Sequence, residues 1–152
     1  MGISSRRELA ELLGGVGLFA RCTRRERATI ARHMETAHFG AETTLIEEGE
    51  EGDAFFLILE GSAVVLRGTR EVAVVRAGAY FGELALLDGA TRSATVRTTE
   101  PATVAVLGAR MFRNLLREFP ELTLQLLAGV AAELRRTRDD LDGVIVPGAA
   151  SG

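Results

Sequence analysis

The sequence predicts an α+β fold, in which a closed or folded-over antiparallel sheet, a jelly roll or barrel, lies between helices at both ends of the chain. Apolar residues follow a helical period up to about residue 36 and again from about residue 110. Between them come short β-branched runs separated by glycines, which is typical of antiparallel strands joined by tight turns. The chain of 152 residues is long enough for one domain of this kind.

Residues 4–36 are predicted to be helical. Leu9, Leu12 and Leu13 recur at helical spacing. Thr23 followed by Glu26 forms a capping-box pattern, so a second helix should begin there and run to about Met34. Glycines at positions 14, 15 and 17 separate the two helices.

Residues 37–107 are predicted to form the strands. Gly61 divides one long apolar stretch into two strands, and Gly68–Arg70 marks the next hairpin. The apolar and β-branched runs that predict strands are Thr43–Ile46, Ala54–Leu59, Ala63–Leu66, Val72–Val75, Ala94–Arg97 and Thr103–Leu107.

Residues 110–142 are predicted to return to helix. A short helix should end near Pro120, and Pro120 suits the first turn of the long helix that follows, where its missing N–H is not needed. Gly143 and Pro147 should stop that helix after about Leu141. Residues 143–152 are then expected to be a disordered tail.

Composition excludes several classes of site. All 18 basic residues are arginine, so lysine chemistry and phosphate-loop lysines are absent. The single Cys22 and the two histidines, His33 and His38, predict neither a disulfide nor a metal site. A net charge of −3 gives no basic field for nucleic-acid binding. The sequence shows no apolar run that would span a membrane and no signal peptide, so the expected location is the cytoplasm.

A break in the strand pattern between residues 80 and 96 predicts a ligand site. Residues 82–87 favour a short helix, whose first turn offers unpaired N–H groups and a positive dipole end. Gly82 would let an anion approach the backbone, and Arg92, expected at the start of the next strand, would offer a fork of donors to a phosphate. Glu83 would repel a phosphate but suits a sugar hydroxyl. Each of these residues alone fits a plainer role, but together they predict a phosphorylated sugar with a free hydroxyl.

The segment FGELALLDGATRSATV resembles the phosphate-binding cassette of cyclic nucleotide-binding domains. This family includes protein kinase A regulatory subunits, cyclic nucleotide-gated channels and bacterial catabolite activator proteins. The resemblance covers residues 4–142, including the strand pair GDAFFLILEGSAVVL and the helices on either side. It implies an eight-stranded antiparallel β jelly roll, flanked by N-terminal helices and two C-terminal helices, that binds a 3′,5′-cyclic nucleotide. Thr91 departs from the family pattern, which has proline there, although the catabolite activators lack this proline too.

The same resemblance implies a role for each residue of the cassette. Glu83 would accept a hydrogen bond from the ribose 2′-hydroxyl, and Arg92 would bind an exocyclic phosphate oxygen. Ser93 would contact the phosphate, or the guanine amino group in members selective for cGMP. Backbone groups of Gly82, Leu84 and Ala85 would hold the cyclic phosphate.

A heptad stripe on the long helix allows three uses: packing on the barrel or on the preceding helix, a lid over the base, or a dimer seam. In the catabolite activators a threonine at the position matching Thr137 hydrogen-bonds the adenine, so the resemblance implies cAMP as the ligand, with cGMP as the alternative. Arg136 and Arg138 are further candidates, because a guanidinium stacks on a purine. The stripe consists of Thr123, Leu127, Val130, Leu134, Thr137 and Leu141.

The predicted function is that of a stand-alone cyclic-nucleotide sensor that passes a conformational signal to an unknown downstream protein. Such a chain is not an enzyme, has no cofactor or metal, binds neither nucleic acid nor membrane by itself, and could form a homodimer through the long helix. Two alternatives are a degenerate jelly-roll interaction module without a ligand, and a fragment of a larger cAMP-regulated protein. A cupin-type enzyme would need clustered histidine and acidic ligands, which the sequence lacks.

Overall fold

Two four-stranded antiparallel sheets form the centre of the structure, a computed structural model that describes residues 5–142 and the side chains of residues 5–138. Their strand orders are β1-β8-β3-β6 and β2-β7-β4-β5, which confirms the predicted eight-stranded antiparallel jelly roll. The strands are β1 (Glu35–Phe39), β2 (Thr44–Ile46), β3 (Ala54–Glu60), β4 (Ser62–Arg67), β5 (Arg70–Arg76), β6 (Tyr80–Phe81), β7 (Thr95–Thr98) and β8 (Ala102–Gly108).

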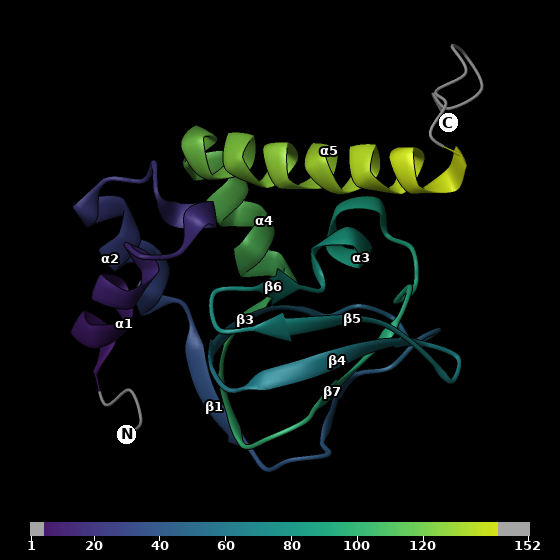
Figure 1. Ribbon diagram of the computed structural model, residues 1–152. Coiled ribbons are helices and arrows are strands. Elements are labelled where there is room, and N and C mark those ends of the chain that lie inside the picture. The colour runs from purple at the N-terminus through teal and green to yellow at the C-terminus, as the bar shows by residue number, and fades with distance from the viewer. Residues whose placement is uncertain (1–4, 143–152) are drawn as a thin grey trace.

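Helices precede and follow the sheets, and one short helix interrupts them (Figure 1). The two N-terminal helices lie together at one end of the jelly roll, and the long last helix passes over the short inserted one. The helices are α1 (Arg6–Leu13), the 3-10 turn η1 (Gly17–Phe19), α2 (Arg24–Arg32), α3 (Glu83–Asp88), α4 (Ala109–Glu118) and α5 (Pro120–Asp142).

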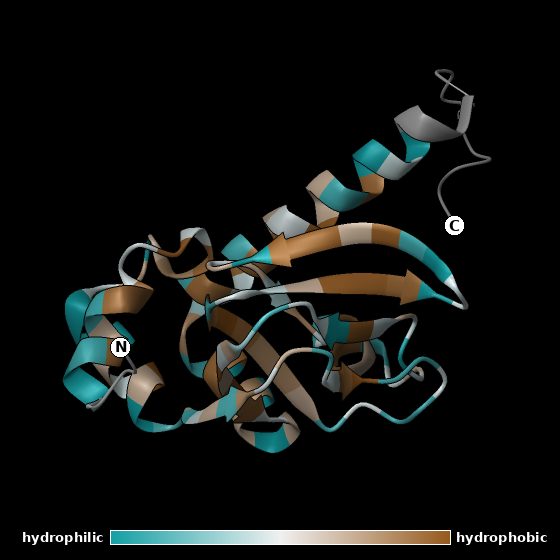
Figure 2. Cartoon of the chain, turned by 60° about the horizontal axis from the view of Figure 1, so that its bottom comes forward, coloured by the Kyte–Doolittle hydropathy of each residue, from teal (hydrophilic) through white to brown (hydrophobic). Residues whose placement is uncertain are grey.

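Strand β3 divides the apolar side chains between two cores, because successive residues of a strand point to opposite faces. Phe55 stacks on Phe112 of α4 with ring centroids 4.9 Å apart, in the cluster that joins the helices to the sheet. Phe56 stacks on Phe81 at 5.1 Å, in the cluster between the two sheets. Figure 2 shows the hydrophobic strands and the more hydrophilic N-terminal helices.

The N-terminal helices follow the sequence prediction except at their end. The capping box is present, with the Thr23 hydroxyl accepting from the Glu26 N–H and the Glu26 carboxylate accepting from the Thr23 N–H. Helix α2 ends at Arg32, however, and β1 begins at Glu35, so the prediction of helix to residue 36 is wrong at its last residues. The backbone of Glu35 instead pairs with Val106 on β8, a partner that is distant in the sequence.

Helix α5 packs on a different line of residues from the predicted heptad stripe. It begins at Pro120 as predicted and buries Leu122 and Leu126. Leu127 and Leu134 of the stripe are 56% and 48% exposed, so the stripe does not pack against the barrel at these positions. The side chain of Leu141, and the predicted tail at residues 143–152, lie outside the described part of the chain. None of the described helices is both long and apolar enough to cross a membrane.

Candidate functional site

Helix α3 begins after Gly82, where both a left-handed backbone and close packing require a glycine. Gly82 has φ 91° and is the N-cap residue of α3. A Cβ atom there would lie 2.8 Å from the Ala54 carbonyl oxygen and 2.8 Å from Arg92 Nη1. Both values are too short for non-bonded atoms, so the site requires glycine. The predicted short helix is confirmed, one residue later than predicted at each end.

Arg92 is buried beneath α3 and binds two backbone carbonyls. Its Nη1 donates to Gly82 O and its Nη2 donates to Ala54 O, each at 3.0 Å. The residue is only 5% exposed, and the Asp53 carboxylate lies 3.7 Å from Nη2. Its carbon Cζ also lies 5.9 Å from the centre of the Phe56 ring. The guanidinium therefore ties the start of α3 to the start of β3.

The position of Arg92 differs from the sequence prediction in one respect. It lies in the loop before β7, which begins at Thr95, rather than at the start of that strand. The loop is held against residues 49–50, because the Arg92 N–H donates to Glu50 O and Arg92 O accepts from the Gly49 N–H. These two backbone hydrogen bonds fix the loop without a strand.

Glu83 is influenced electrostatically by a second carboxylate, Glu133 on α5. Burial raises the pKa of Glu83 above its ordinary value, and the negative charge of Glu133 adds to this rise. Hydrogen bonds from the backbone of Glu83 and Leu84, together with the Arg92 charge, oppose the rise in pKa. Burial, Glu83 and Glu133 also raise the pKa of Tyr80, so these three side chains share one environment between α3, β6 and α5.

A close contact holds α5 at this place. A Cβ atom on Gly129 would overlap the Tyr80 hydroxyl, so the helix backbone comes directly against the tyrosine. Glycine inside a helix costs about 1 kcal/mol relative to alanine, which makes Gly129 a signal in the sequence that this close approach now explains. Sequence reasoning had not assigned Gly129, Glu133 or Tyr80 to the site.

The other predicted site residues lie around α3 and on α5. In the first turn of α3 the Leu84 side chain is 48% exposed and Ala85 is buried. Ser93 is exposed next to Arg92. Thr137 is exposed on α5, and its hydroxyl donates to Glu133 O at 3.0 Å, one turn earlier in the same helix.

Gly52 lies against both α3 and Arg92, and sequence reasoning had not assigned it to the site. A Cβ atom there would lie 2.6 Å from Ala85 Cβ and 3.2 Å from Arg92 Cζ. The segment that leads into β3 therefore packs against both the helix and the arginine. Among residues 5–138, no group of three or more histidine, cysteine or acidic side chains is placed to hold a metal ion.

Replacing Glu83 with glutamine is expected to stabilise the domain at neutral pH. A pKa raised in the folded state means that the ionised carboxylate is disfavoured there, by burial and by Glu133. Glu83 therefore contributes to stability only while it is protonated. This contribution is complete below the pKa of Glu83 in the unfolded chain and is lost as the pH rises through its pKa in the folded chain. The gain in Glu83→Gln over wild type should therefore shrink as the pH falls and vanish in acid. Thermal melts from pH 3 to 8 check this, with the exposed Glu71→Gln as control; a gain independent of pH would contradict it.

A family model, "Cyclic nucleotide-binding domain", matches residues 36–119. That range begins within β1 and ends just after α4, so it contains α3 and all of the jelly roll except the first residue of β1. A cAMP-dependent protein kinase regulatory subunit of Hypocrea atroviridis is 35% identical over 133 residues, which are 88% of this chain and 26% of that protein. The chain thus spans about a quarter of the length of that relative.

Solved structures show the same likeness in three dimensions. A PKAR CBD2 bound to Sp-2Cl-cAMPS has a TM-score of 0.77 and 27% identity, covering 93% of this chain and 94% of that one. The regulatory domain of Toxoplasma gondii PKA with cAMP has a TM-score of 0.74 and 31% identity, covering 84% of this chain and 50% of that one. With the cassette sequence and the eight-stranded jelly roll already in place, these matches show that the chain belongs to the cyclic nucleotide-binding domain family.

Proposed function

We propose that this domain binds a 3′,5′-cyclic nucleotide, cAMP in preference to cGMP, at α3 and Arg92. The observation that carries the proposal is the buried Arg92 held directly under the first turn of α3, within the family's cassette sequence. A guanidinium has five N–H donors, and two of them bind Gly82 O and Ala54 O. The remaining donors suit an exocyclic phosphate oxygen, and backbone groups of Gly82, Leu84 and Ala85 suit the rest of the cyclic phosphate.

Glu83 is proposed to bind the ribose 2′-hydroxyl. A carboxylate that is disfavoured by burial gains from a neutral donor, because the hydrogen bond stabilises its ionised form without bringing another negative charge. Ser93, exposed beside Arg92, is proposed to contact the phosphate.

Helix α5 is proposed to cover the base. Its close approach to Tyr80 at Gly129 and the electrostatic effect of Glu133 on Glu83 support this role. Thr137 is the proposed adenine contact, which requires its hydroxyl to donate to the base instead of to Glu133 O. Arg138 is the second candidate, since its Nε is buried and has no hydrogen-bond partner among the described residues.

The output is proposed to be regulation rather than catalysis. The relatives are regulatory subunits. We propose that residues 4–142 form the sensor domain, within a larger cytoplasmic regulatory protein, and that ligand binding shifts α5 relative to the barrel. The shift is limited by the difference in ligand affinity between the two positions of the helix.

The exposed leucines of α5 are the proposed contact surface for that output. Leu124, Leu127 and Leu134 are each about half exposed on one helix. A second copy of the chain or a partner protein would bury them, and sedimentation of the domain with and without cAMP distinguishes a homodimer from a monomer.

A thermal-shift titration tests the ligand. We expect cAMP to raise the melting temperature in proportion to log concentration above its Kd, because it binds only the folded state. 5′-AMP should shift it far less, since it has no cyclic phosphate. Glu83→Ala should weaken cAMP strongly and 2′-deoxy-cAMP little, because the deoxy ligand has no hydroxyl to lose. Equal shifts with cAMP and 5′-AMP, or no shift with any nucleotide, would indicate a degenerate module instead.

A further inference from the structure

Positive charge is concentrated in the N-terminal helices although the chain as a whole is acidic. Between residues 5 and 34 there are seven of the 18 arginines but only three of the 21 acidic residues. The net charge of −3 conceals this separation. Sequence reasoning that used only the total charge therefore found no basic field, whereas the folded chain has one.

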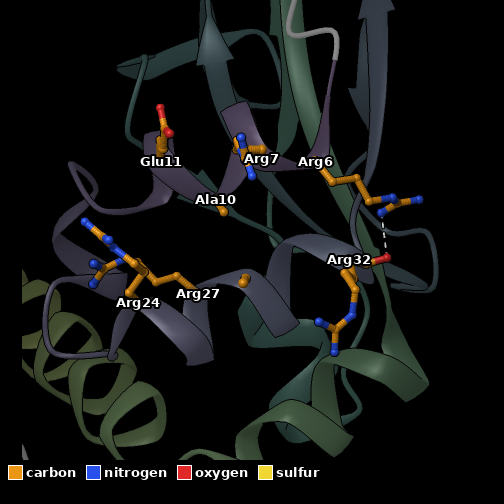
Figure 3. Close-up of a pocket in the computed structure, with 8 residues that line it drawn as sticks. Arg6, Arg7, Ala10, Glu11, Arg24, Arg27 and Arg32 are labelled. Carbon is orange, nitrogen blue, oxygen red and sulfur yellow. Dashed lines mark hydrogen bonds between the residues drawn. The ribbon is translucent and has the colours of Figure 1, made fainter.

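Five of these arginines line a cavity of about 740 Å³ between α1 and α2, which we call the arginine groove (Figure 3). The alanines of the lining, Ala10 on α1 and Ala28 on α2, have side chains too short to fill the space between the helices. Glu11 is the one acidic residue among the lining residues. The lining arginines are Arg6, Arg7, Arg24, Arg27 and Arg32.

Two of the arginines are held in place by backbone carbonyls. Arg6 Nη1 donates to Ala31 O at 3.0 Å and to Met34 O at 2.9 Å, and Arg27 Nη1 donates to Cys22 O. A carbonyl fixes the position of a guanidinium and, unlike a carboxylate, brings no formal negative charge. The groove is therefore preorganised by the fold, which lowers the entropy lost when an anion binds.

Among residues 5–138, no salt bridge is found for the five arginines that line the groove. The salt bridges found among the described residues are made by Arg92, Arg97 and Arg136, far along the chain from α1 and α2. Arg7 and Arg24 are exposed on either side of the groove, one on each helix. An anion lying between them would contact both helices at once.

We propose that the arginine groove binds a linear polyphosphate group, as in tripolyphosphate or a nucleoside triphosphate. The lining has five guanidinium groups and one carboxylate, and this excess of positive charge suits an anion with several charges. Each phosphate carries one to two charges at neutral pH, and the guanidinium fork matches its oxygens bidentately. The cavity has the volume of an ordinary small-molecule site. An acidic peptide would bring only one charge per residue and would lose backbone entropy at each one.

The groove is separate from the cyclic-nucleotide site and does not depend on it. It lies between α1 and α2, whereas the cassette is α3 and the loop of Arg92. The two regions are joined through the same apolar cluster, which contains Leu13 and Ile30 from the N-terminal helices and Leu86 from α3. Because no residue that lines the groove belongs to the cassette, binding at one site can be measured with the other occupied.

Calorimetry with sodium tripolyphosphate tests the proposal. We expect binding to wild type that is at least tenfold weaker in Arg7→Gln/Arg24→Gln. The matched control, Arg67→Gln/Arg70→Gln, changes the net charge equally at the exposed β4–β5 hairpin and should leave the affinity within twofold. Circular dichroism confirms that both variants fold. No binding, or equal losses in the two variants, would overturn the proposal.

Further titrations identify the ligand and the site. Inorganic phosphate should bind more than tenfold more weakly than tripolyphosphate, because it engages fewer guanidinium groups. ATP binding as tightly as tripolyphosphate would show recognition of the phosphate chain alone, and tighter ATP binding would show that a nucleoside triphosphate is the source. Tripolyphosphate binding should persist in saturating cAMP; its loss would place the anion in the cassette and overturn the proposal. An oligoglutamate peptide that binds more tightly than tripolyphosphate would also overturn the proposal.

Discussion

Replacing Arg92 with alanine is expected to reduce both the free energy of unfolding and the affinity for cAMP. The guanidinium occupies a site that is closed to solvent and satisfies Gly82 O and Ala54 O. Leaving a buried acceptor unpaired costs about 1–3 kcal/mol, so we expect a loss of stability of about 2–4 kcal/mol. Losing one charge-assisted contact to the phosphate should weaken cAMP by about 10- to 150-fold.

Two further variants separate the roles of Arg92. Arg97→Ala removes an arginine from the neighbouring strand β7, where it is partly exposed and lies 3.7 Å from Glu42, so it should change stability by less than about 1 kcal/mol. Arg92→Lys keeps the charge but lacks the fork that reaches two carbonyls, so it should recover only part of the loss. Urea denaturation and calorimetry measure both quantities. An Arg92→Ala protein as stable as wild type would show that the two carbonyls are not held by this side chain.

Replacing Gly82 with alanine is expected to lower the free energy of unfolding much more than replacing Gly89 with alanine, although both glycines have positive φ. Gly82 has φ 91° and Gly89 has φ 74°, at opposite ends of α3. The left-handed backbone alone costs about 1–2 kcal/mol for a residue with a Cβ. At Gly89 nothing lies within 4 Å of the added carbon, whereas at Gly82 it would meet Ala54 O and Arg92 Nη1. Gly82→Ala should therefore lose at least about 3 kcal/mol, and Gly89→Ala about 1–2 kcal/mol.

The same pair of variants reports on the ligand site. Relief of the clash at residue 82 requires Arg92 or the start of β3 to move, so cAMP binding should fall by tenfold or more in Gly82→Ala. In Gly89→Ala the first turn of α3 is undisturbed and the affinity should stay within about threefold. Both are measured by urea denaturation and calorimetry at one temperature. Equal losses in the two variants would mean that backbone strain, and not the contact with Arg92, makes Gly82 necessary.

Local patterns predicted the elements whose signals lie within a few residues. The capping box at Thr23, the turn at Gly61 and the helix start at Pro120 are each decided by neighbouring residues, and all are present. Strand β1 and the two-residue strand β6 depend instead on partners far away, since Glu35 pairs with Val106 and Tyr80 with Leu57. No local pattern in the sequence contains that information.

The sequence predicted which residues of the site lie close together, but not the hydrogen bonds that position them. The order of Gly82, Glu83 and Arg92 indicated one site, and the structure places Arg92 against Gly82. The second carbonyl it binds belongs to Ala54, 38 residues earlier, and sequence spacing does not reveal such a contact. The heptad stripe of α5 was visible, yet the buried line through Leu122 and Leu126 is set by the surface beneath the helix.

Strand β3 belongs to both apolar cores, through Phe55 on one face and Phe56 on the other. A displacement of this strand must be accommodated in the two clusters together, because both are packed against one backbone. Free-energy changes of substitutions in different clusters should then fail to add wherever both side chains touch β3. Arg92 holds the first residue of the same strand through Ala54 O. The site is thus linked to both clusters through β3. By the thermodynamic cycle, the factor by which a core substitution at β3 changes the ligand affinity equals the factor by which the bound ligand changes the effect of that substitution on the folding equilibrium.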